Sequence, residues 1–201
     1  MAITINGSGT ITGISAGGYP DGTVTAADLA SSLDLSGKTV TLPSGTGGKV
    51  LQVVTTPYTG QFSTSTANTY QQVTGLNCSI TTSSASSRVL VMIALGQMSS
   101  VANGTASFAV SRDGTRILLG AVDGVRGTCS FKYCCPDTSH SDGTAFMGID
   151  SPGSAGTYVY GLQAIAQSGA TVYINRTQVN SNLTDSYENR GSSHITLMEI
   201  A

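Results

Sequence analysis

The chain has 201 residues and a net charge of −2, and only 10% of its residues are charged, against about 25% in an average globular domain. This charge gives no sign of the extensive basic surface that binds nucleic acid or an anionic membrane, so we expect neither partner. No run reaches the roughly 18 apolar residues of a membrane span. Ser, Thr and Gly account for 79 of the residues, a composition that favours strands and turns over helices.

The first 48 residues are predicted to form an extended, glycine-rich leader. From Ile3 to Ile14, apolar and polar residues alternate as in a strand, but glycines break the pattern into very short pieces. Such a segment cannot bury enough apolar surface to fold alone. We therefore expect it to pair with other copies or to dock on a partner. The apolar side chains expected to anchor it are Ile3, Ile5, Ile11, Ile14, Leu29 and Leu33.

One short helix is predicted within the leader, over residues 25–33. Thr25 can cap its N-terminus, and Asp28 stands three residues further on, as in a capping box. Pro43 and the glycine-rich run to Gly48 mark the end of the leader. The chain is thus expected to have two parts, the leader (residues 1–48) and a second domain (residues 49–201).

The second domain is predicted to be all-β, an antiparallel sandwich that resembles a jelly roll. Strand-like runs recur about every ten residues, which is the spacing of a sandwich or barrel. Asp113-Gly114 and Ser168-Gly169 each separate two such runs and predict hairpins. The last run is expected inside a sheet, because an unpaired edge favours aggregation. The predicted strands cover residues 49–55, 69–73, 76–82, 88–97, 105–112, 115–121, 127–134, 143–150, 157–166, 170–176 and 193–200.

Four cysteines are present, and two of them are adjacent. The first seven residues lack the basic and apolar regions of a secretory signal, so we expect synthesis in a cytosol, where thiols stay reduced. A single disulfide and a metal site near His140 remain as alternatives. The cysteines are Cys78, Cys129, Cys134 and Cys135.

Two short motifs of catalytic type lack the context that their chemistry needs. Residues 13–17 match G-x-S-x-G, but a nucleophile elbow requires a buried strand before the Ser and a helix after it. Residues 37–39 read Gly-Lys-Thr, the end of a phosphate-binding loop, but the first glycine of that motif is missing and a strand-like run follows. We interpret both as chance matches.

The titratable residues give no clear catalytic set either. Asp137, His140 and Asp142 share one polar loop, which could bind a metal but which we interpret as a solvated connection. The chain has two Glu residues, Glu188 and Glu199, and they do not suggest the paired carboxylates of a glycosidase. We therefore predict that the protein is not an enzyme and needs no cofactor.

A second polar loop, residues 176–190, holds candidate binding residues. Tyr187 could face a sugar ring, with Asn189 and Arg190 beside it. These three are the residues predicted to face a receptor. A plain connection between strands is the favoured alternative, because most loops are connectors.

Two parts of the chain resemble tail-fibre and fibre-like virion proteins of tailed phages, above all those of marine and cyanobacterial phages. DGTVTAADLA (residues 21–30), followed by LSGKTVTLP (residues 35–43), is similar to the N-terminal part of these proteins. Residues 79–91 and the ending ITLMEI (residues 195–200) are similar to their C-terminal domain. These motifs are strand and turn patterns, so the resemblance implies a family without assigning any catalytic residue.

The resemblance implies a homotrimer located in the virion, assembled in the host cytoplasm, whose leader binds other virion proteins. On this basis we expect a short tail fibre or fibre tip that projects the β-domain toward the host surface, with surface glycans as further partners. No long shaft follows the leader, which departs from a full-length fibre. The alternative is a capsid-decorating head fibre or cement protein anchored by its leader.

Overall fold

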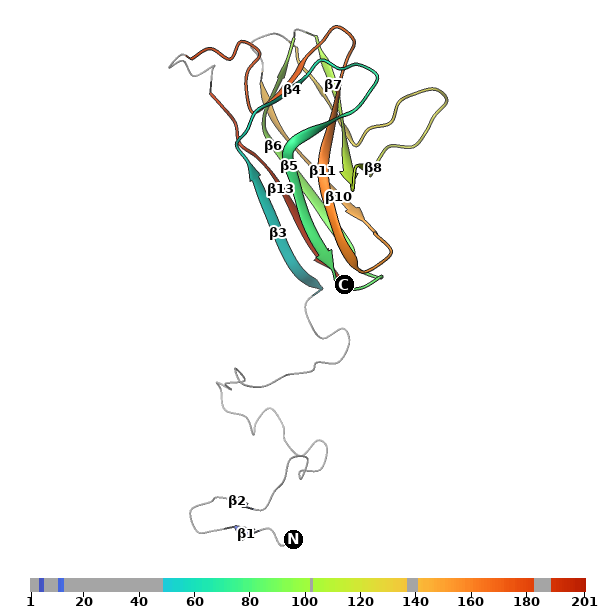
Figure 1. Ribbon diagram of the computed structural model, residues 1–201, viewed down its shortest axis with the longest axis vertical. Helices are drawn as coiled ribbons and strands as arrows, with labels where there is room; N and C mark the ends of the chain where they lie inside the picture. Colours follow the sequence, from blue (N-terminus) through green and yellow to red (C-terminus); the bar gives the residue numbers. More distant parts are fainter. Residues whose placement is uncertain (1–3, 6–10, 13–48, 102, 137–140, 183–188) are drawn as a thin grey trace. The chain divides into compact units, whose positions relative to one another are not determined.

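The computed structural model describes residues 4–5, 11–12, 49–101, 103–136, 141–182 and 189–201 (Figure 1). Within the leader, β1 (Thr4–Ile5) pairs antiparallel with β2 (Ile11–Thr12), so that Ile5 stands opposite Ile11. The helix predicted over residues 25–33 lies outside the described residues.

The described part of residues 49–201 contains strands and no helix, which confirms the all-β prediction. Consequently, none of the described segments is a helix of the length and apolar character needed to cross a membrane. The strands are β3 (Val50–Tyr58), β4 (Phe62–Thr64), β5 (Gln71–Thr82), β6 (Arg88–Ser100), β7 (Thr105–Arg112), β8 (Thr115–Ile117), β9 (Phe131–Cys134), β10 (Asp142–Asp150), β11 (Gly156–Ala166), β12 (Val172–Ile174) and β13 (Ser193–Ile200).

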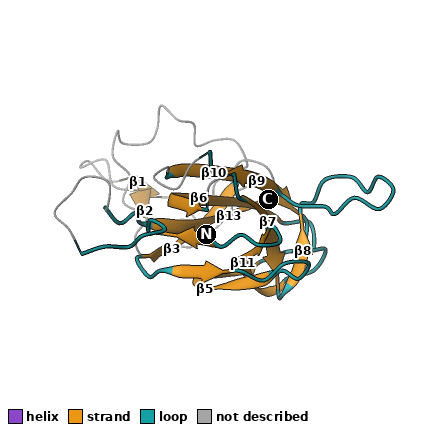
Figure 2. Ribbon diagram, turned by 90° about the horizontal axis from the view of Figure 1, so that it is seen from above, coloured by secondary structure: helices purple, strands orange, loops and turns teal. Residues whose placement is uncertain are grey.

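These strands form two antiparallel sheets packed face to face (Figure 2). In the first sheet, β13 lies between β3 and β6, and β10 pairs with the other edge of β6. In the second sheet, β11 lies between β5 and β7, and β8 and β9 pair with the far edge of β7. Numbered by chain order, the eight longest strands follow the orders 1-8-3-6 and 2-7-4-5. This is the strand order of a jelly roll, as predicted.

The core lies between the two sheets and follows the two-residue period of the strands. In β6, residues Val89, Val91, Ile93 and Leu95 point inward and are almost completely buried. Phe108 of β7 stacks on Phe131, with ring centroids 4.9 Å apart, and Phe131 stacks on Phe146 of β10 at 5.5 Å. Each large side chain buried in this way contributes about 1.5–3 kcal/mol to folding.

The hairpin predicted at Asp113-Gly114 is confirmed. It joins β7 to β8, with Arg112 opposite Thr115. Asp113 and Gly114 have φ values of 50° and 80°, which is the left-handed region that a two-residue hairpin turn demands and that Asp-Gly readily adopts. The terminal strand β13 pairs on both sides, with β3 and β6, so its predicted place inside a sheet is also confirmed.

Three strand predictions need correction. The runs predicted as separate strands at 69–73 and 76–82 form the single strand β5, in which Gly75 takes a φ of 90° and bends the strand without ending it. The strand predicted over residues 115–121 stops at Ile117, because Leu118 turns to a φ of 54°. The short strand β4 was not predicted, since three residues give no readable period.

The second predicted hairpin, at Ser168-Gly169, is wrong. The chain does turn there, and Ala170 N–H donates to Gln167 O at 2.9 Å. However, β11 before the turn belongs to the second sheet, whereas β12 after it pairs with β4 and β6 of the first sheet. The segment therefore crosses between the sheets, and a turn signal alone does not distinguish this crossing from a hairpin.

Candidate functional site

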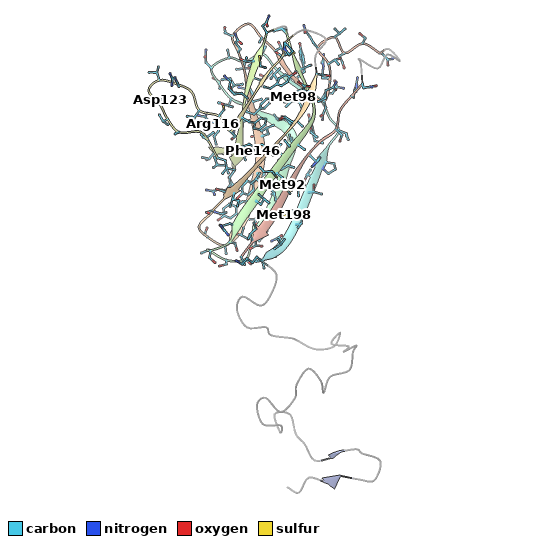
Figure 3. All side chains as sticks on the ribbon, turned by 180° about the vertical axis from the view of Figure 1, so that it is seen from behind. Met92, Met98, Arg116, Asp123, Phe146 and Met198 are labelled. Atoms are coloured by element: carbon cyan, nitrogen blue, oxygen red, sulfur yellow. The ribbon has the colours of Figure 1, made fainter. Side chains whose placement is uncertain are left out.

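The outer face of the first sheet is apolar. Its register sets Ile149, Leu90, Met198 and Val53 in one row across β10, β6, β13 and β3. The next row contains Met147, Met92, Thr196 and Thr55, and the third contains Ala145, Ala94, His194 and Pro57. Figure 3 labels Met92 and Met198 on the adjacent strands β6 and β13. The residues that we call the apolar face are Leu51, Val53, Leu90, Met92, Met147, Ile149, Met198 and Ile200.

Much of this face is exposed to solvent in the single chain. Met147 is 68% exposed, Val53 is 53% exposed, and Leu51 and Ile149 are each 48% exposed. None of the three rows contains Asp, Glu, Lys or Arg. Arg88 lies beyond the rows, at the end of β6 beside Ile200. A contiguous uncharged surface of this kind is typical of a protein–protein contact.

The sequence holds a signal for this surface in the uninterrupted apolar run Val89–Leu95. The run places apolar residues on both faces of β6, whereas a strand with one solvated face should alternate apolar and polar residues. A strand that is apolar on both faces is usually buried on both faces by other parts of the protein or by a partner. The structure covers the inner face with the second sheet, and nothing in the described chain covers the outer one.

Buried hydrogen bonds hold the terminal strand that carries part of this face. The Glu199 side chain is 1% exposed and points inward from β13. Its carboxylate accepts hydrogen bonds from Gln52 Nε2 (2.6 Å), Ser83 N (2.6 Å), Ser83 Oγ (2.7 Å) and Ser87 Oγ (2.7 Å). Burial alone would raise the pKa of Glu199, but these donors outweigh it and lower the pKa to about 2.

The opposite edge of the sheet is fixed by a second polar group. At the end of β10, Asp150 accepts hydrogen bonds from Arg112 Nη1 (2.5 Å) and from Tyr160 Oη (2.7 Å), both of which come from the second sheet. Burial acts to lower the pKa of Arg112, and the hydrogen bond and charge of Asp150 reverse that effect and raise it. Sequence patterning did not reveal this group, because its three members are brought together only by the packing of the sheets.

The leader residues predicted as anchors are mostly not described. Ile5 and Ile11 stand opposite each other in the β1–β2 pair. The other four, Ile3, Ile14, Leu29 and Leu33, lie outside the described residues, so their anchoring role stays a prediction.

The loop predicted to face a receptor is described in part. Asn189 and Arg190 are exposed and line a small hollow of about 180 Å³ together with residues of β6 and the start of β10. Arg190 Nη2 donates to Asn180 Oδ1 at 3.5 Å. Tyr187, on which the sugar-binding idea rested, lies outside the described residues.

The remaining sequence candidates do not converge on a reactive centre in the described structure. No disulfide links any of the four cysteines, and Cys78 and Cys135 are buried. Asp142 is described, whereas Asp137, His140 and Glu188 are not. Among the described residues, no three His, Cys, Asp or Glu side chains are grouped as a metal site would require.

Comparison with known proteins does not identify a family for this chain. No protein-family model matches the chain, and no curated protein matches it.

Proposed function

We propose that this protein is a structural component of a bacteriophage virion, a homotrimeric short tail fibre or fibre tip that contacts the host surface. The phage assignment rests on the sequence resemblance described above. The observation that carries the assembly is the apolar face, which the described part of the chain leaves exposed. Such a face would lower the solubility of a monomer.

A second copy of the chain is the occupant that fits this face best. The three rows contain no Asp, Glu, Lys or Arg, so three copies of this face can converge on a three-fold axis without like-charge repulsion between such residues. Burying apolar surface contributes about 25 cal/mol per Å², and symmetric self-association lets every subunit bury the same surface. Methionines suit such a contact, because their flexible side chains adapt to the opposing surface.

A matched pair of valines tests the assembly. Val53 lies on the apolar face and is 53% exposed, whereas Val159 lies on the outer face of the second sheet and is 43% exposed. The Val53→Asp variant is expected to sediment as a monomer, since a carboxylate would have to lose its water at the interface. The Val159→Asp variant is expected to remain trimeric.

Sedimentation equilibrium of the full chain and both variants gives the decisive comparison. Unchanged thermal unfolding of the monomeric variant at low concentration would show that the fold itself survives the substitution. A monomeric wild-type protein at micromolar concentration would refute the proposed trimer. If the Val53→Asp and Val159→Asp variants were both monomeric, the assignment of the contact to the apolar face would be refuted.

The place of the protein on the particle distinguishes the tail fibre from the capsid-decorating alternative. Electron cryomicroscopy of intact virions should locate its density at the tail or over the head lattice. Deleting residues 2–43 tests the leader. If the leader attaches the protein, the truncated chain should fold but fail to enter particles, and its normal incorporation would contradict that role.

A further inference from the structure

A groove lies on the outer face of the second sheet, beside the loop that connects β8 to β9. It measures about 840 Å³, within the roughly 300–1,000 Å³ typical of small-molecule sites. Ile165, Ser107 and Lys132 stand side by side across β11, β7 and β9 and line its floor. Figures 1 and 2 show the β8–β9 loop projecting from the sandwich. The groove therefore belongs to the sheet opposite the apolar face.

The groove concentrates positive charge. Of the nine basic residues in the chain, three line it: Arg116, Arg126 and Lys132. Arg126 pairs with Asp123, another residue of the projecting loop (Figure 3). Within the described residues, Arg116 and Lys132 form no ion pair with a carboxylate, and none of the lining residues is acidic. A local excess of positive charge in a chain of net charge −2 points to an anionic ligand.

Two of the lining side chains are already held in place. The Arg116 guanidinium lies over the Tyr70 ring, with Cζ 4.5 Å from the ring centroid, a cation–π arrangement. Tyr70 Oη in turn donates a hydrogen bond to Thr128 O at 3.0 Å, which ties the ring to the loop. Arg116 is thereby oriented before any ligand arrives, and this lowers the entropy lost on binding.

The rest of the lining mixes hydrogen-bonding and aliphatic groups. Thr69, Ser107 and Gln163 supply hydroxyl and amide groups. The Gln163 amide is oriented by its own bond, in which Nε2 donates to Gly114 O at 2.9 Å. Val122, on the projecting loop, is 80% exposed and adds an apolar surface. A sugar ring has the same two aspects, a polar edge of hydroxyls and a less polar face of C–H groups.

We propose that this groove binds an acidic saccharide, with Arg116 and Lys132 holding its carboxylate and Gln163 and Ser107 contacting its hydroxyls. The planar guanidinium fork of Arg116 matches the geometry of a carboxylate. Nucleic acid fits less well, because its affinity depends on many phosphate contacts and on stacking against open aromatic faces. Here Arg116 already occupies a face of the Tyr70 ring. This site goes beyond the proposed assembly, since it lies on the other sheet and does not depend on the trimer.

Calorimetry with the full-length protein tests the site. The probes are tetragalacturonate, the neutral tetrasaccharide maltotetraose, inorganic phosphate and a twenty-nucleotide oligothymidylate. Tetragalacturonate is expected to bind at least about tenfold more tightly than maltotetraose, because each charge-assisted hydrogen bond is worth about 1.5–3 kcal/mol. Raising the salt concentration should weaken this binding.

Charge variants locate the binding. Lys132→Glu should reduce the affinity for tetragalacturonate at least about tenfold, and Arg116→Ala should do the same. Lys49→Glu is the matched control, since Lys49 is an exposed lysine that does not line the groove, and it should leave the affinity unchanged. Because Lys132 is exposed, its variant keeps the test valid even if Arg116→Ala disturbs the fold.

Several results would overturn the proposal. They are no binding at about 1 mM tetragalacturonate, equal binding of maltotetraose, tighter binding of phosphate or oligothymidylate, and unchanged affinity in Lys132→Glu. Sedimentation of the same samples reports the oligomeric state separately. A failed saccharide site therefore remains distinguishable from a failed assembly.

Discussion

At the scale of single residues, the Glu199 carboxylate couples the fold to pH. Its pKa of about 2 in the folded chain lies below its ordinary value of 4.5. A group whose pKa is lowered on folding stabilises the fold above its unfolded pKa and loses that effect as the pH falls through the folded pKa. The contribution of Glu199 should therefore be complete above about pH 5 and decline toward pH 2. Its size is about 3 kcal/mol.

The Glu199→Gln variant isolates this contribution. At pH 7 the variant should unfold in urea with about 3 kcal/mol less stability than the wild type. At pH 3 the difference should be clearly smaller, because the Glu199 carboxyl of the unfolded wild type is then largely protonated and must lose that proton on folding. Comparing the two proteins at each pH cancels the titration of the other carboxyl groups. A difference that stays constant from pH 7 to pH 3 would contradict the assigned role.

Asn175 is a second residue whose exact chemistry matters to the fold. It is fully buried, and its Nδ2 donates to Tyr58 O and to Gly60 O, both at 2.9 Å. Asn175→Asp would place carboxylate oxygens against these two carbonyls. We expect a loss of at least about 3 kcal/mol in urea unfolding at pH 7. Asn103→Asp is the control, because Asn175 and Asn103 have similar positive φ values of 59° and 57°, but Asn103 is exposed. If both variants lost a similar free energy of unfolding, the effect would come from the positive φ of the backbone and not from the buried carbonyl groups.

At the scale of the elements, close backbone contact at Gly96 joins β6 to the segment that leads into β13. A Cβ atom at Gly96 would stand 2.1 Å from Ser192 O. Gly96 N–H also donates to Ser193 Oγ at 3.1 Å, on the same segment. Only glycine permits this approach, so the start of β13 depends on it.

The Gly96→Ala variant tests this contact. We expect it to lower the free energy of unfolding by about 3 kcal/mol, because the backbone of the segment must move away. At Gly120 the nearest atom to an added Cβ lies 3.8 Å away, so Gly120→Ala should unfold at nearly the same temperature as the wild type. Equal melting temperatures for both variants would show that the segment at Ser192 adapts at little cost.

At the scale of the whole molecule, the two sheets present different surfaces. The apolar face of the first sheet and the basic groove of the second should respond differently to salt. Raising NaCl from about 0.1 M to about 1 M should leave the sedimenting mass of the oligomer unchanged, because apolar contacts are not screened. The same change should weaken tetragalacturonate binding, and an oligomer that dissociates at high salt would show that charge holds it together.

The sequence by itself determined the all-β class, the antiparallel sandwich and the Asp113-Gly114 hairpin. These follow from short-range rules, namely the two-residue period of strands and the φ values that Asp and Gly tolerate. The same rules misjudged Ser168-Gly169, where the chain crosses between the sheets. A turn signal reports a change of direction, and the partner of the next strand is set by the packing.

Only the tertiary structure decided which residues form surfaces and pairs. Arg116, Lys132 and Tyr70 stand in separate segments, and strand order brings them to one groove. Leu90, Met198, Val53 and Ile149 form one row because four strands from distant parts of the chain share a register. The alternation of apolar and polar residues within each strand is a local property of the sequence. Which strand pairs with which depends on how the whole core is buried. The face that remains uncovered follows from that choice.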